Sequence, residues 1–272
     1  MSAQLFPRLF AGHAAEIYTL PAELIAARDV AARLDKLAPP DAPDPEDVTD
    51  ELVAATLAAA ATDTGQVPDC SGISEARHQR QITEDAGQVW RYASEQAAQL
   101  VATSVRHGAE TILVDHLRPA HAAVVKDLGA AFAATRQYGS PSELLLAPAK
   151  VRQAAASIDG LCEQYEAIRG GRGDLEWTVS YRSTDDADGE FAEVANANDL
   201  WVRPQHRNVG NASSPPWPTT STRSKLEWLL NHGATVWLPT PTEQDTKWRE
   251  VYAAELAAAE NQRQMGAAVS MM

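Results

Sequence analysis

The sequence predicts a mainly α-helical protein, in which an antiparallel helical bundle is followed by a smaller α+β C-terminal part. Apolar residues recur at spacings of three and four through much of the first 170 positions, which is the period of a helix with one buried face. Alanine dominates the apolar residues, and alanine favours helix while burying little area per residue. Composition changes after position 170. The expected domains are residues 1–45, 46–170 and 171–272.

The first domain is predicted to be one helix followed by a linker. The helix is expected from about Pro21 to Leu37, because apolar side chains share one face there. This face is formed by Ile17, Leu20, Leu24, Ala27, Ala31 and Leu34. The stretch APPDAPDPEDV that follows contains four prolines, which predicts an extended, semi-rigid linker. The sequence leaves open whether the helix packs on its own chain or on a neighbouring copy.

The second domain is predicted to contain the bundle helices. They are expected over residues 46–62, 74–107, 120–136 and 142–169. Gly108 and Pro119 are expected to interrupt the helical run between the second and third of them. A narrow apolar stripe marks the second helix and consists of Ile82, Ala86, Val89, Ala93, Ala97 and Leu100.

The third domain is predicted to begin after a turn at Gly170-Gly171-Arg172-Gly173. Alternating side chains predict strands over 175–182 and 191–202, joined by a hairpin turn at DADGE. DADGE is not expected to bind calcium, because the first and last loop positions would hold Thr184 and Ala195. A loop over 203–221, a short helix over 224–232, a strand at ATVWL and a helix from Thr242 complete the prediction.

Charge and cysteine content limit the classes of protein. A net charge of −14 repels phosphate backbones and disfavours broad nucleic-acid binding. Cys70 and Cys162 are the only cysteines, too few for a disulfide framework and without metal-type spacing. The N-terminal residues lack the features of a signal peptide, and no apolar stretch approaches the roughly 20 residues of a membrane span. The expected location is the cytoplasm, or an assembled virion.

Histidine spacing provides the nearest approach to a metal or catalytic site, at His107, Asp115, His116 and His121. Helical metal ligands prefer spacings of three or four, whereas His116 and His121 are five apart with Pro119 between them. No metal or cofactor is therefore expected. The absence of Gly-x-Ser-x-Gly, His-Glu-x-x-His and paired-cysteine motifs favours a protein that is not an enzyme. An enzyme with scattered residues around His107–His121 stays an alternative.

Tryptophan and arginine concentrate in the C-terminal third. Six of the seven tryptophans lie between Trp177 and Trp248, and residues 200–226 contain no acidic side chain. Such residues are enriched in protein–protein hot spots, and they can also stack on single-stranded nucleic acid. A third possibility is that the tryptophans form the core of this domain. The candidate interaction residues are Trp201, Arg203, Arg207, Trp217 and Arg223.

The chain resembles helical virion and assembly proteins of actinobacterial phages. The resemblance is one of composition, carried by TLPAELIAARDVAARLDKL, by VYAAELAAAENQRQ and by 18 arginines against 5 lysines. It implies a virion component, connector or assembly factor and assigns no site residue. The predicted function is a structural or assembly role through contacts with other protein subunits, identical or different. The alternatives are the enzyme and a single-stranded nucleic-acid binder acting through residues 200–226.

Overall fold

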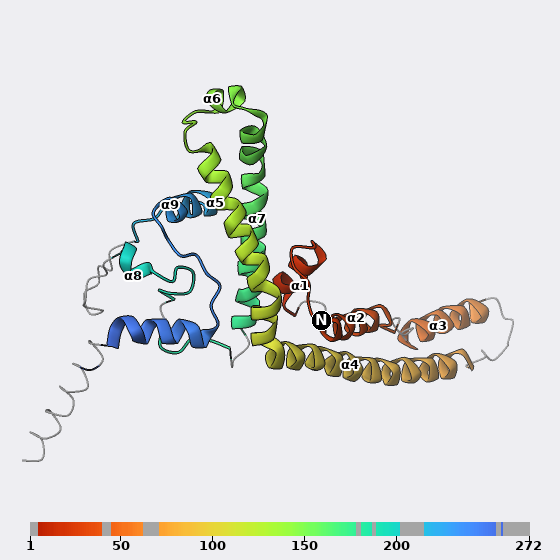
Figure 1. Cartoon of the computed structure of the whole chain (residues 1–272). Helices are drawn as coiled ribbons and strands as arrows, with labels where there is room; N and C mark the ends of the chain where they lie inside the picture. The colour runs from red at the N-terminus through yellow and green to blue at the C-terminus, as the bar shows by residue number, and fades with distance from the viewer. Residues whose placement is uncertain are drawn as a thin grey trace, which may run out of the picture. The chain divides into compact units, whose positions relative to one another are not determined.

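A computed structural model of the 272-residue chain describes residues 5–39, 45–61, 71–177, 181–186, 189–201, 215–253 and 257. The chain divides into two compact units. The first unit comprises Met1–Leu5 and Ala22–Ser104, and the second comprises Phe6–Pro21 and Val105–Met272. The helices labelled in Figure 1 are α1 (Pro7–Ala14), α2 (Ala22–Lys36), α3 (Pro45–Ala61), α4 (Ser71–Thr111), α5 (Arg118–Thr135), α6 (Pro141–Leu146), α7 (Ala149–Glu176), α8 (Ala197–Leu200) and α9 (Thr222–Asn231). A π-helix, η2 (Ile112–Leu117), lies between α4 and α5.

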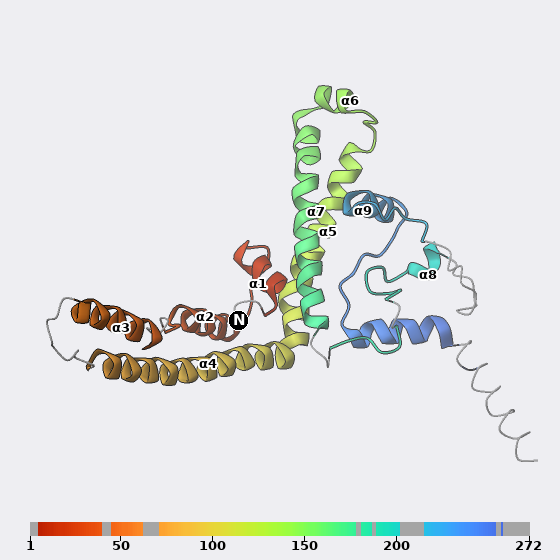
Figure 2. The same cartoon turned by 180° about the vertical axis from the view of Figure 1, so that it is seen from behind.

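The prediction of a mainly α protein is confirmed. In the first unit, α2 and α3 lie along α4 (Figures 1 and 2), and both helices begin and end within about one residue of their predicted bounds. Trp90 of α4 donates its Nε1–H to the carbonyl of Leu34 near the end of α2 at 2.7 Å. The same carbonyl accepts the backbone N–H of Leu37 at 2.9 Å, so both hydrogen bonds help to satisfy the last turn of the helix. None of the helices in the described ranges is long and apolar enough to cross a membrane.

The predicted interruption at Gly108 and Pro119 is wrong, because the chain stays helical from α4 through η2 into α5. Proline lacks the N–H that an α-helix uses and crowds the carbonyl four residues earlier. The π-helix provides a wider turn just before Pro119, and the N–H of Arg118 donates to the carbonyl of Leu113, five residues back. This widened turn lets the helix pass the proline without a loop.

The antiparallel pair α5 and α7 forms the centre of the second unit (Figure 1). The helix predicted over 142–169 is two helices, since α6 ends at Leu146 and α7 begins at Ala149. Ala147 is extended, with ψ of 157°, as expected for a residue that precedes a proline. α7 then continues beyond its predicted end to Glu176.

The predicted turn at Gly170-Gly171-Arg172-Gly173 is also wrong, because these residues lie inside α7. Gly171 and Gly12 of α1 both face the phenol of Tyr18. A β-carbon at Gly171 would lie 2.6 Å from the Tyr18 hydroxyl, and one at Gly12 would lie 2.4 Å from it. The two glycines therefore make room for a buried tyrosine that donates to the carbonyl of Leu9 at 2.8 Å. This contact lies far away in sequence, so local turn propensity was misleading.

The predicted α+β C-terminal part is not found. In the described residues after 170 there are no strands, and pairing is limited to an isolated antiparallel bridge between Val194 and Val236. Residues 175 and 176 belong to α7, residues 178–180 lie outside the described ranges, and residues 197–200 form α8. A helix over residues 241–253 follows the bridge. The alternating pattern arises because these segments cover a small core rather than form a sheet.

That core contains most of the C-terminal tryptophans. Its buried members are Phe191, Val194, Ala197 and Leu229. Partly buried residues packed around them include Trp217, Trp228, Trp237 and Trp248. The two strands that DADGE was predicted to join are not present in the described residues, and residues 187 and 188 of this segment lie outside them. The Asp186 carboxylate accepts the backbone N–H of Glu190 at 2.9 Å and that of Phe191 at 2.7 Å.

Candidate interaction surfaces

Three of the five candidate interaction residues can be placed, and two of these belong to one aromatic cluster. The rings of Trp201 and Trp217 meet edge to face with centroids 5.9 Å apart, and Trp217 lies 6.1 Å from Trp228. Trp228 stacks on His232 at 4.0 Å with an interplanar angle of 12°. Both Trp201 and Trp217 are half-buried. The tryptophans thus contribute to packing of the C-terminal core, which was one of the three possibilities for them.

The basic candidates are separated from this cluster or cannot be described. Arg203 and Arg207 lie within 202–214, outside the described residues. Arg223, on α9, is exposed and forms an ion pair with Asp159 of α7, with 2.9 Å between Nη1 and Oδ1. Its neighbour Lys225 pairs with the mostly buried Glu193. These two cations therefore connect α9 with α7 and with residue 193, within the second unit.

The structure does not gather the histidines into a site. His107 is exposed, His116 is half-buried on η2, and His121 is 2% exposed on α5. In the portion of the chain that is described, no three His, Cys, Asp or Glu side chains are grouped as metal ligands. These three histidines therefore do not form a shared metal site in the described part of the chain.

His121 nevertheless has an unusual environment. Its ring lies 5.3 Å from that of Tyr165, and its Nε2 is buried without a hydrogen-bond partner among the described atoms. Burial, with the nearby charges of Arg169 and Arg172, lowers the pKa of His121 to about 4, although Glu193 opposes this effect. The imidazole is therefore neutral at pH 7. A cavity of about 420 Å³ between α5 and residues 236–243 includes His121 in its lining.

Exposed apolar side chains mark the long helix α4. We call Ile82, Val89, Tyr92 and Leu100 the α4 stripe; all four are exposed, and Val89 is 71% exposed. A helix turns about 100° per residue. Val89 follows Ile82 by seven residues and Leu100 follows Val89 by eleven, so these three side chains lie close to one line along the helix. The packed face of α4 lies to one side and includes Ala76, Trp90, Ala97 and Val101. The predicted stripe on this helix thus points mostly to the surface, with Ala97 as its buried member.

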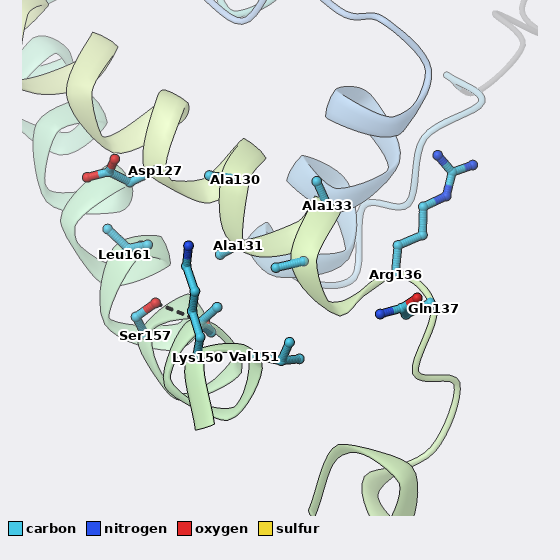
Figure 3. A pocket seen from close by; sticks show the side chains of 12 residues that line it. Asp127, Ala130, Ala131, Ala133, Arg136, Gln137, Lys150, Val151, Ser157 and Leu161 are labelled. Atoms are coloured by element: carbon cyan, nitrogen blue, oxygen red, sulfur yellow. Dashed lines mark hydrogen bonds between the residues drawn. The ribbon is translucent and has the colours of Figure 1, made fainter. Parts of the chain in front are cut away.

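A second apolar surface lies between α5 and α7. We call it the α5–α7 groove; it has a volume of about 850 Å³ (Figure 3). Its walls are mainly small apolar residues: Ala130, Ala133 and Ala134 from α5, with Val151, Ala154 and Leu161 from α7. Figure 3 shows the Lys150 side chain extending into the space between the walls, whereas Arg136 points away. Nothing in the sequence indicates this groove, because it depends on how two separate helices diverge.

Next to the groove, α6 joins the two helices and carries exposed leucines. We call Glu143, Leu145 and Leu146 the α6 tip; Leu145 is 72% exposed and Leu146 is 90% exposed. The tip is held by reciprocal capping, since Ser140 Oγ accepts the N–H of Glu143 at 3.3 Å and Glu143 accepts the N–H of Gly139 at 2.7 Å. Two adjacent leucines are thus presented by a fixed helical turn.

Comparison with known proteins adds no assignment. No protein-family model, curated protein or solved structure matches this chain. What the chain does must therefore be inferred from its own surfaces.

Proposed function

We propose that this protein is a structural or assembly protein that acts by binding other protein subunits, with a phage virion component or connector as the specific role. The observation that carries the proposal is the exposed apolar surface of the first unit. Among described side chains, eight of the eleven large hydrophobic residues with high exposure lie in this unit: Val30, Leu37, Val53, Leu57, Ile82, Val89, Tyr92 and Leu100.

Apolar side chains on a surface are ordinary when scattered singly, but a row of them favours an interface. The α4 stripe follows one side of a 41-residue helix, which offers a long contact surface. Burial of each such side chain contributes roughly 1–2 kcal/mol, because part of its area is already covered. A partner helix along the stripe would supply this burial.

The test is the mass of the full chain in solution, measured by light scattering after size exclusion over a concentration series. We expect a mass above the 29.3 kDa of one chain. Replacing Val89 and Leu100 together by serine should lower the mass, because it removes two of the four apolar side chains of the stripe. Replacing their exposed neighbours Gln88 and Gln99 by serine is the matched control and should leave it unchanged. A mass of one chain at every concentration contradicts the proposal.

A further inference from the structure

The α6 tip and the α5–α7 groove both present apolar side chains. The tip presents Leu145 and Leu146, and the groove is walled by alanines that leave its volume of about 850 Å³ unfilled. At 1.5 Å per residue, the wall from Val151 to Leu161 is about 15 Å long, and the six-residue α6 is about 9 Å long. The groove is therefore long enough to accept one such tip.

Their charges are complementary. Glu143 is the only charged residue between Arg136 and Lys150, so the tip carries a single negative charge. The groove carries Arg136 and Lys150 near its open end, against Asp127 further along α5. A tip seated from outside would bring the Glu143 carboxylate toward the Lys150 ammonium, which extends between the walls (Figure 3).

The chain's own α6 does not occupy its own groove. Only Ala147 and Pro148 join α6 to α7, and Ala147 is buried while the proline restricts the backbone. This short, fixed connection holds Leu145 and Leu146 away from the groove beside them. A second copy has no such restriction, and two copies related by a twofold axis can form the contact twice.

We propose that two copies of this chain pair by each seating its α6 tip in the α5–α7 groove of the other. The inference rests on the proposed function, since it names a second copy as a partner. The pair would bury four leucines and form two Glu143–Lys150 ion pairs. Such a small contact suits a weak dimer, with a dissociation constant of roughly micromolar size.

Charge reversal in trans tests the pairing. The Glu143→Lys chain and the Lys150→Glu chain are each measured alone by sedimentation equilibrium, and then mixed with donor and acceptor dyes. Each variant alone places like charges at both contacts, so its dissociation constant should rise about tenfold. In the mixture both contacts become attractive again, so the mixed pair should form with a dissociation constant within about twofold of the unmodified chain's. Lys126→Glu, an exposed lysine of α5 outside the groove, is the control and should pair normally.

The measurements are repeated in the Val89→Ser, Leu100→Ser chain. Assembly through the α4 stripe then does not hide the effect of a tip variant on pairing. Replacing Leu145 and Leu146 together by serine should abolish pairing with helical content unchanged by circular dichroism. The inference is overturned if the mixture pairs no more tightly than either variant alone. That result is expected if α6 instead closes over the groove of its own chain. If the unmodified chain assembles and every tip variant assembles equally tightly, the inference is overturned and the proposed function stands. A chain that is monomeric at every concentration contradicts both.

Discussion

The carboxylate of Asp174, near the end of α7, accepts the backbone N–H of Leu9 in the first turn of α1 at 2.9 Å. The same oxygen accepts the N–H of Arg8 at 2.8 Å. The residue that precedes α1 is Phe6, whose side chain has no oxygen to cap the helix. A residue 165 positions away therefore supplies the N-cap that the local sequence lacks.

The first prediction concerns this cap. Asp174→Ala should lower the free energy of unfolding by about 2 kcal/mol, because the buried N–H of Leu9 and the partly buried N–H of Arg8 lose a charged acceptor. Asp174→Asn should cost about half as much, since an amide oxygen still accepts but carries no charge. Urea unfolding measures both. Asp159→Ala, which removes an exposed carboxylate from the same helix, should cost less than about 0.5 kcal/mol. Equal effects at the two positions would contradict the capping role.

The second prediction concerns Gly171. Alanine normally stabilises a helix relative to glycine, but here its β-carbon would lie 2.6 Å from the Tyr18 hydroxyl. Gly171→Ala should therefore destabilise the protein by about 2 kcal/mol. In a Tyr18→Phe chain the nearest remaining side-chain atoms lie 3.4 Å or more from that β-carbon, so the same substitution should be neutral or stabilising.

The control for this prediction is Gly160 of the same helix. An added β-carbon there would meet nothing within 4 Å, so Gly160→Ala should stabilise by about 0.5–1 kcal/mol. Thermal unfolding of Gly160→Ala, Gly171→Ala, Tyr18→Phe and the Gly171→Ala, Tyr18→Phe double variant measures these effects. It separates the helix propensity of alanine from the contact with the Tyr18 hydroxyl. If Gly171→Ala costs as much in the Tyr18→Phe chain as in the chain that keeps Tyr18, the hydroxyl is not the obstacle.

These two contacts also show what the sequence could predict. The helices over 22–36 and 45–61 follow from apolar spacing and flanking prolines, which are local signals. Gly171 lies inside α7, where it leaves room for Tyr18. The helix passes Pro119 through a π-helix. Neither feature is visible in a window of neighbouring residues. The strands expected after 170 failed because alternation reflects burial on one side, whether or not a partner strand is present.

The sequence also predicted only part of the candidate interaction surfaces. Trp201 and Trp217 were identified from composition, and they lie together, but composition could not decide how much of each ring is buried. Ile82, Val89 and Leu100 of the α4 stripe were identified from spacing, whereas Tyr92 was not. Spacing alone does not show whether a stripe faces a core or the surface. The α5–α7 groove was missed, because small residues such as Ala134 give no signal until two helices are placed together.

The third prediction concerns Arg172, which is 3% exposed. Its guanidinium donates to Gln244 Oε1 at 2.9 Å and to the carbonyl of Ala192 at 3.3 Å, and it pairs with Glu176 at 2.8 Å. Arg172→Met keeps much of the packing but removes the donor from the buried Gln244 Oε1 and the partner from Glu176. The Ala192 carbonyl keeps the hydrogen bond that Arg169 donates at 2.8 Å. It should lower the free energy of unfolding by about 2 kcal/mol. Hydrogen exchange should accelerate more in residues 241–253 than in α5, and uniform acceleration would contradict this linking role.

The last prediction follows from His121. Its pKa in the folded chain is about 4, against an ordinary value of 6.5. The folded state therefore binds fewer protons than the unfolded state in this window, and stability falls as the pH drops below about 6.5. Between pH 7 and pH 5 this group alone should cost about 2 kcal/mol, and the loss should level off below about pH 4. His121→Phe keeps a ring beside Tyr165 and removes the titrating group. The difference in the free energy of unfolding between this variant and the unmodified chain should therefore change by about 2 kcal/mol from pH 7 to pH 5. Urea unfolding at several pH values measures the difference, in which the shared carboxylate titrations cancel. A constant difference from pH 7 to pH 5 would show that the imidazole accepts a proton in the folded chain as readily as in water.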